Sequence, residues 1–201
     1  RVSPEKLERQ VEKMGPYLGP SFFEALCKEE MAMICEVKKA SPSKGMISPD
    51  FPYLEIARAY EKGGAAAISC LTEPHFFLGE DRYLQEITQT VSLPVLRKDF
   101  VIEARQMGAA AVLLICAILN DQELASFLRL AHSLGLDALV ETHSEEEIHR
   151  AVQAGARIIG INNRDLASFQ VDLKTSERLC RRIPKGTIWI SESGIRSHED
   201  V

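Results

Sequence analysis

The sequence of 201 residues lacks both long apolar runs and an excess of positive charge. No stretch approaches the roughly 20 apolar residues that a membrane span needs, and the polar N-terminus does not resemble a signal peptide. Lysine and arginine total 24 against 29 acidic residues, giving a formal net charge of -5. This balance argues against a surface that neutralises many phosphates. We therefore expect a cytoplasmic protein that binds no nucleic acid and no membrane.

The residue spacings that are typical of metal sites are also missing. The five cysteines are odd in number and show no C-x-x-C pattern, so we expect buried, reduced thiols. Among the five histidines, His143 and His149 are too far apart for the usual i, i+4 pair on a helix. We therefore expect no metal site.

Short apolar runs rich in β-branched residues recur along the chain and predict seven strands. These runs are 33–37, 66–71, 94–96, 111–115, 138–140, 157–161 and 187–190. Helical patterns lie between most of them and stop at glycines, as 54–62, 121–133 and 144–153 do. Asp121 and Ser144 are candidate N-caps, and Ser144 with Glu147 fits the capping-box spacing.

This alternation of strand and helix predicts parallel strands covered by helices, in either a closed barrel or an open doubly wound sheet. No G-x-G-x-x-G follows the first strand, and polar residues follow the ends of most strands, which favours a (β/α)8 TIM barrel. We expect one domain, with an N-terminal helical extension over 1–30 and barrel units one to seven over 31–201. The eighth βα unit is absent from this sequence, so we expect the working protein to contain further residues.

Strand alternation predicts which charged residues share a face. Residues two apart point the same way, so Glu36 and Lys38 lie together at the end of the first strand. The same parity directs Lys98, Glu141 and the pair Asn162 and Arg164 inward, where they would converge on one pocket. Charges are rarely buried unless paired, so a converging set favours function over structural salt bridges at strand ends.

Two lysines in one pocket suggest proton transfer. A neighbouring cation and partial desolvation both lower the pKa of a lysine, and burial of Glu141 would raise the pKa of its carboxyl group. Together they would supply an acid and a base.

Two loops are candidates for phosphate binding, and one for an aromatic ligand. The turn that begins at Ser41 carries hydroxyls and amides suited to an oxyanion, while Ser193 and Gly194 lead toward a helix start after the seventh strand. Barrel phosphate sites commonly use the loops after strands seven and eight. Phe76 and Phe77 either cover the core or form an apolar wall for an aromatic substrate.

The segment Glu36-Val37-Lys38-Lys39-Ala40-Ser41-Pro42-Ser43-Lys44-Gly45 is very similar to the signature of indole-3-glycerol phosphate synthases. Further matching segments follow in order at 71–79, 94–100, 140–143, 160–166 and 191–195. The resemblance covers essentially the whole chain. It implies a (β/α)8 barrel with an extra N-terminal segment and no cofactor. The implied reaction converts 1-(2-carboxyphenylamino)-1-deoxyribulose 5-phosphate to indole-3-glycerol phosphate, carbon dioxide and water.

Position by position, the resemblance also implies roles. Lys98 matches the principal general acid, Glu141 the base in dehydration, and Lys38 the cation that holds the substrate carboxylate. The residues implied near the sugar are Glu36, Asn162 and Glu192, of which Glu36 is counted as catalytic, and Arg164 is implied near the anthranilate end. The implied phosphate site includes Ser41, Ser193 and Gly194, and the residues implied near the aromatic ring are Phe76, Phe77 and Phe100.

The sequence departs from the family in two places. Several residues that usually follow Phe100, where we expect a mobile lid, are missing, and so is the eighth unit with half of the phosphate site.

Two alternatives remain open: another phosphosugar barrel enzyme such as phosphoribosylanthranilate isomerase, whose motifs do not match, or a non-catalytic fragment that binds a partner. We expect a phosphorylated small-molecule substrate and a monomer or weak homo-oligomer, with fusion to or association with another tryptophan-pathway enzyme as an option.

Overall fold

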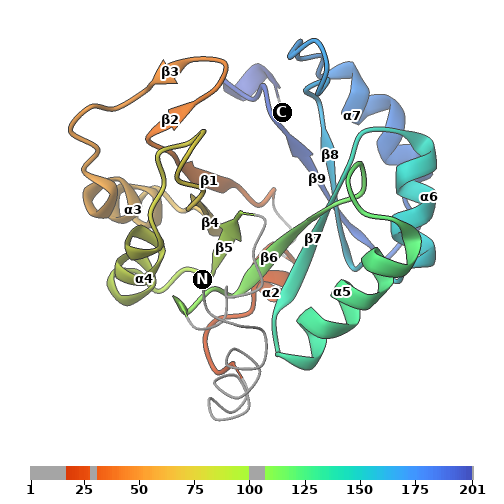
Figure 1. The fold of residues 1–201 in the computed structure, drawn as a ribbon, viewed down its shortest axis with the longest axis horizontal. Helices are drawn as coiled ribbons and strands as arrows, with labels where there is room; N and C mark the ends of the chain where they lie inside the picture. The colour runs from red at the N-terminus through yellow and green to blue at the C-terminus, as the bar shows by residue number, and fades with distance from the viewer. Residues whose placement is uncertain (1–16, 28–30, 100–106, 201) are drawn as a thin grey trace. The chain divides into compact units, whose positions relative to one another are not determined.

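The computed structural model describes residues 17–27, 31–99 and 107–200 (Figure 1). The chain divides into two compact units. Unit 1 comprises Arg1–Val112 and Ala131–Asp137, and unit 2 comprises Leu113–Leu130 and Ala138–Val201.

Unit 1 is built on parallel strands in the order β1-β4-β5-β6. Its strands are β1 (Ile34–Val37), β4 (Ala67–Leu71), β5 (Val95–Lys98) and the first residues of β6 (Ala111–Ile115), and its helices are α2 (Phe22–Leu26), α3 (Tyr53–Lys62) and α4 (Asp81–Thr90). Helices α3 and α4 pack on each other beside these strands (Figure 1). A short antiparallel hairpin, β2 (Ala40–Ser41) and β3 (Gly45–Met46), follows β1.

Unit 2 continues the same alternation in the strand order β6-β7-β8-β9. Its further elements are α5 (Asp121–Ser133, whose last turn belongs to unit 1), β7 (Asp137–Thr142), α6 (Glu145–Gln153), β8 (Ile158–Asn162), α7 (Lys174–Leu179), η2 (Cys180–Arg182), β9 (Ile188–Glu192) and η3 (His198–Asp200). Strands β7, β8 and β9 pair in parallel, and α7 packs against β8 (Figure 1).

The strands are almost continuously apolar because helices cover them. All five residues of β4 are buried, as are the first four of β8. The core of unit 1 includes the fully buried side chains of Phe22, Ile68, Leu84, Ile87 and Leu96. That of unit 2 includes Leu124, Leu128, Ile148, Ile158, Ile159, Ile161 and Leu179.

All seven predicted strands are confirmed, but four of them end one or two residues later than the apolar pattern indicates. As a result Lys98, Glu141, Asn162 and Glu192 are the last or nearly last residues of strands, rather than the first residues of loops. Their side-chain directions are therefore set by strand geometry, which fixes them more firmly than a loop would.

One of the two N-cap predictions is confirmed, and the other is wrong. Ser144 caps α6, with its Oγ accepting the Glu147 N–H at 3.2 Å, as predicted. Asp121 is wrong as a cap, because Asn120 has that role. The Asn120 Oδ1 accepts the Glu123 N–H and the Glu123 carboxylate accepts the Asn120 N–H, both at 2.9 Å. This reciprocal pair is a capping box that lies one residue earlier than the prediction.

The cysteine prediction needs a correction. All five cysteines are free, but only Cys70 and Cys116 are buried, and Cys27 is exposed.

Among the described residues, no helix has the length and apolarity to span a bilayer. The predicted extension over 1–30 is represented by α2, and residues 1–16 and 28–30 lie outside the described residues.

Candidate active site

The predicted site residues fall in both units, and in unit 1 they centre on Glu36. This residue lies on β1, and Lys38 follows two positions later on the same face, so its Nζ donates to Glu36 Oε1. Lys98 ends β5, and its Nζ lies 3.4 Å from Glu36 Oε2. The three side chains are between 26% and 30% exposed, so they remain open to a ligand.

The charges around Glu36 determine its protonation state. Burial would raise the pKa of its carboxyl group, but Lys98 and Lys38 outweigh burial and lower that pKa below its ordinary value. Glu36 is therefore ionised at neutral pH. Its carboxylate contacts the side-chain nitrogens of both lysines, an interaction that the prediction about two neighbouring lysines did not include.

Arg97 is a charged residue that the sequence analysis did not single out. Its side chain is 3% exposed and points to the opposite side of β5 from Lys98. Its Nη2 lies 2.7 Å from Asp81 Oδ1 and 3.5 Å from Asp99 Oδ2, and its Nε donates to Thr72 Oγ1 at 3.0 Å. Thr72 and Asp99, which follow strand ends, therefore stabilise a buried guanidinium. The signal for this was an arginine directly after an apolar run, because a charge next to the core needs acidic partners.

The loop after β4 is held by a buried glutamate. The Glu73 carboxylate accepts the backbone N–H groups of His75, Phe76 and Phe77 at 2.8, 2.6 and 3.2 Å. Burial would raise the pKa of Glu73, but these three donors lower it below its ordinary value. Phe76 is 67% exposed, so the suggestion that it covers the core is wrong. Phe77 is half-buried, and Phe100 lies outside the described residues.

Ser41 occupies the hairpin after β1. It is the last residue of β2, it is buried, and it pairs with Gly45 across the turn. Its Oγ lies 3.5 Å from Ser43 Oγ. Gly45 has φ +64, a value that favours glycine, which explains how so short a turn closes. The predicted polar turn is thus a defined hairpin.

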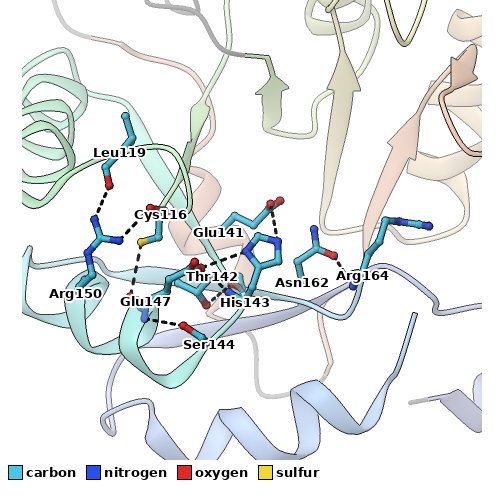
Figure 2. A network of polar contacts seen from close by, with 11 residues as sticks. Cys116, Leu119, Glu141, Thr142, His143, Ser144, Glu147, Arg150, Asn162 and Arg164 are labelled. Carbon is cyan, nitrogen blue, oxygen red and sulfur yellow. Dashed lines mark hydrogen bonds and ion pairs between the residues drawn. The ribbon is translucent and has the colours of Figure 1, made fainter. Parts of the chain in front are cut away.

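In unit 2, Asn162 and Ser193 come together as one polar pair. Asn162 ends β8, and its Oδ1 accepts the Ser193 hydroxyl at 2.8 Å and the Arg164 N–H at 3.0 Å. The Arg164 guanidinium donates to the Phe169 carbonyl at 3.0 Å. The side chain of Asn162 lies at the end of β8, and that of Arg164 lies beyond it (Figure 2).

Glu192 and Gly194 show why small residues are needed here. Glu192 on β9 pairs with Asn162 on β8, and a Cβ added to Gly160 would overlap the Glu192 carboxylate. Ser193 and Gly194 have φ +69 and +90, and a Cβ at Gly194 would lie 2.5 Å from Val171 Cγ1. The backbone after β9 therefore turns sharply, and at Gly194 it has a conformation that only glycine adopts readily.

Two residues that the sequence analysis missed support this region. Asn163, which is 3% exposed, bonds through its side chain to Ser176, Ser191 and the Ser193 carbonyl. His143 lies beside the buried Glu141, with Nε2 at 3.4 Å from Glu141 Oε1 (Figure 2). The signal for His143 was its position two residues after Glu141, which continues the face of β7 on which Glu141 lies.

Comparison with known proteins identifies the family. The family model described as indole-3-glycerol phosphate synthase matches residues 2–201. The indole-3-glycerol phosphate synthase of Endomicrobium trichonymphae is 57% identical over 187 residues, which cover 90% of this chain and 72% of that protein. The enzyme of that name from Ruminiclostridium cellulolyticum is 52% identical, with 91% of this chain and 73% of the relative covered. The chain belongs to the indole-3-glycerol phosphate synthase family.

Members of the indole-3-glycerol phosphate synthase family are carboxy-lyases of tryptophan biosynthesis, and this chain belongs among them. Solved structures with 18% and 21% identity support the fold alone. The first is the N-acetylmannosamine-6-phosphate 2-epimerase of Clostridium perfringens, which has a TM-score of 0.63 and for which the match covers 90% of this chain and 83% of that chain. The second is a thiamine phosphate pyrophosphorylase of Pyrococcus furiosus, which has a TM-score of 0.55 and for which the match covers 72% of this chain and 70% of that chain. The fold is the predicted TIM-barrel type, and the described residues supply seven of its eight strands.

Proposed function

We propose that this protein closes the indole ring of 1-(2-carboxyphenylamino)-1-deoxyribulose 5-phosphate and releases carbon dioxide and water. The observation that carries the proposal is the contact of Glu36 with both Lys38 and Lys98 at the carboxyl ends of β1 and β5. In TIM barrels this end of the strands holds the catalytic groups. The identity of more than half of the residues with a relative of that name supports the same reaction.

Lys98 is the general acid of the ring-closing step. An aromatic carbon of the substrate attacks the ribulose carbonyl, whose oxygen gains negative charge and needs a proton. An ammonium group that is 26% exposed and lies 3.4 Å from the Glu36 carboxylate is a positioned donor. Lys38 pairs with the substrate carboxylate and keeps it in place until carbon dioxide leaves and the ring regains its aromaticity.

The remaining roles follow the site residues of each unit. Glu141 is the base that takes a proton during the loss of water, and its burial excludes solvent from the carboxylate. The residues proposed to bind substrate are Glu36, Asn162 and Glu192 at the sugar, Arg164 and the aromatic Phe76, Phe77 and Phe100 at the anthranilate ring, and Ser41, Ser193 and Gly194 at the phosphate. We propose that the protein is cytoplasmic and acts as a monomer or weak homo-oligomer without a cofactor.

The test is indole fluorescence that appears when the protein meets the carboxyphenylamino-deoxyribulose phosphate, with the mass of the intact protein measured in parallel. We expect Lys98→Met to lower kcat by about a thousandfold, within the range typical of general acid catalysis, while circular dichroism stays unchanged. Lys62→Met is the matched control, because Lys62 is an exposed lysine at the end of α3 in the same unit. Full turnover by Lys98→Met would overturn the role of Lys98, and a folded wild type without turnover would overturn the proposed function.

A further inference from the structure

His143 lies between two carboxylates of unit 2 and has no role in the proposed function. It is the residue after β7, and its side chain is 16% exposed. Its Nδ1 lies 3.2 Å from Glu147 Oε2, and its Nε2 lies 3.4 Å from Glu141 Oε1 (Figure 2). The imidazole therefore connects Glu141 to the first turn of α6.

Glu147 fixes the position of the ring. Its Oε2 accepts the backbone N–H of His143 at 2.7 Å as well as contacting Nδ1, and its own N–H donates to the Ser144 cap. Burial would raise the pKa of Glu147, but these interactions with His143 lower it below its ordinary value. Glu147 is thus an ionised acceptor, which assigns a proton to Nδ1 of His143.

This assignment decides what Nε2 presents to Glu141. In the neutral ring with a proton on Nδ1, Nε2 carries a lone pair, and a lone pair facing an ionised carboxylate oxygen is unfavourable. A proton on Nε2 converts the contact into an attraction between an imidazolium and a carboxylate. At 3.4 Å the contact is an ion pair rather than a well-directed hydrogen bond.

Acidic groups from several elements act on His143 and favour the imidazolium. They are Glu141 on β7, Glu147 on α6, Glu192 on β9 and Asp165 after β8. The hydrogen bond with Glu147 raises the pKa of His143 above its ordinary value, burial opposes this, and Glu141 and Glu192 add to the rise. The nearby Arg150 guanidinium is occupied by Asp121 and by two backbone carbonyls (Figure 2).

We propose that His143 is a positioning residue for Glu141, with its imidazolium acting as the counter-charge that holds this buried carboxylate in its orientation. Glu147 sets the tautomer and the ring plane. A buried carboxylate needs a paired cation, and His143 supplies one that disappears at alkaline pH. The proposal rests on the role of Glu141 as a base in the proposed function.

The experiment combines a titration with a rate profile. The wild-type imidazole of His143, identified by NMR as the resonance that His143→Gln removes, should titrate above 6.5. Glu147→Gln should lower that midpoint, because it removes the charge that favours the imidazolium. The kcat of the wild type should fall at alkaline pH with the same midpoint.

The variants separate positioning from general damage. His143→Gln should lose that alkaline step and lower kcat about tenfold, with KM nearly unchanged, because the ion pair that orients Glu141 is lost. His149→Gln is the matched control, because His149 is an exposed histidine on α6. It should keep both the rate and the alkaline step. If His143→Gln does not fold, Glu147→Gln supplies the same readouts through a shifted alkaline midpoint.

Each result decides one part of the argument. A His143→Gln profile that superimposes on the wild type would overturn the role of His143 while leaving the proposed function standing. A His143 midpoint at or below 6.5 would overturn it without any activity measurement. A folded wild type without turnover would instead overturn the proposed function, and the role of His143 with it.

Discussion

Replacing Asn163 with alanine removes the most connected polar side chain of unit 2. Asn163 Nδ2 donates to Ser191 Oγ at 2.9 Å and to the Ser193 carbonyl at 3.1 Å. Its Oδ1 accepts the Ser176 N–H at 3.0 Å and the Ser176 hydroxyl at 2.8 Å. Because the N-cap residue of α7, Leu173, provides no capping side chain, Asn163 satisfies a first-turn amide of that helix from a different element.

The expected loss of stability depends on which hydrogen-bond partners of Asn163 have another partner in the variant. The hydroxyls of Ser176 and Ser191 still contact each other at 2.8 Å in the variant. The Ser193 carbonyl loses its Asn163 partner, whereas the Ser176 N–H keeps its 3.2 Å contact with the Leu173 carbonyl. A stranded polar group costs about 1–3 kcal/mol, so we expect Asn163→Ala to lower the free energy of unfolding by about 2 kcal/mol.

Urea denaturation followed by circular dichroism measures this loss, and hydrogen exchange locates it. Exchange should accelerate at the Ser176 amide, while amides in α3 of unit 1 serve as the internal control. Asn163→Asp is the matched variant, because it keeps the acceptor for Ser176 but loses the donor to Ser193. It should protect the Ser176 amide better than alanine does. An Asn163→Ala protein within about 0.5 kcal/mol of the wild type would refute the assigned role.

Two further predictions concern a helix cap and the dependence of stability on pH. Ser144→Ala removes the acceptor for the Glu147 N–H and should lower the unfolding free energy by about 1 kcal/mol, measured in urea, with Ser126→Ala at an exposed position of α5 as the comparison. The lowered pKa of Glu36 means that its ion pairs stabilise the fold above the unfolded value of 4.5 and lose this effect as the pH falls through the folded pKa. The stability difference between wild type and Glu36→Gln should therefore shrink below pH 4.5, and a difference that stays constant with pH would contradict the assignment.

The fold was predictable because burial of the strands leaves a direct signature in the sequence. Strands such as β4 and β8 are apolar along their length, and glycines follow the helices between them. The strand ends were less predictable, because backbone pairing continues after the apolar pattern stops. Lys98 pairs with Leu71 and Asn162 with Glu192, so polar residues extend the strands without an apolar signal.

For the candidate site, the sequence indicated which side chains share a face of a strand, but not which residues they contact. Alternation correctly placed Glu36 with Lys38, and their side chains are in contact. The partners of Arg97 and Asn163 were hidden, because Asp81 lies on a helix and Ser176, Ser191 and Ser193 lie well beyond Asn163 in the chain. Such contacts depend on how helices pack on strands, which a local pattern does not encode. His143 was considered only as a metal ligand, although its parity with Glu141 indicated a shared face.

The neighbours Arg97 and Lys98 illustrate how one strand separates structural charge from charge available for chemistry. Arg97 is 3% exposed, and Asp81, Asp99 and Thr72 surround its guanidinium, so its charge is neutralised within the protein. Lys98 points the other way, is 26% exposed, and shares the carboxylate of Glu36 with Lys38. The two ammonium groups therefore share one carboxylate at the carboxyl end of β5. A developing oxyanion or a substrate carboxylate would be attracted to these ammonium groups, which is the electrostatic condition that a general acid at Lys98 requires.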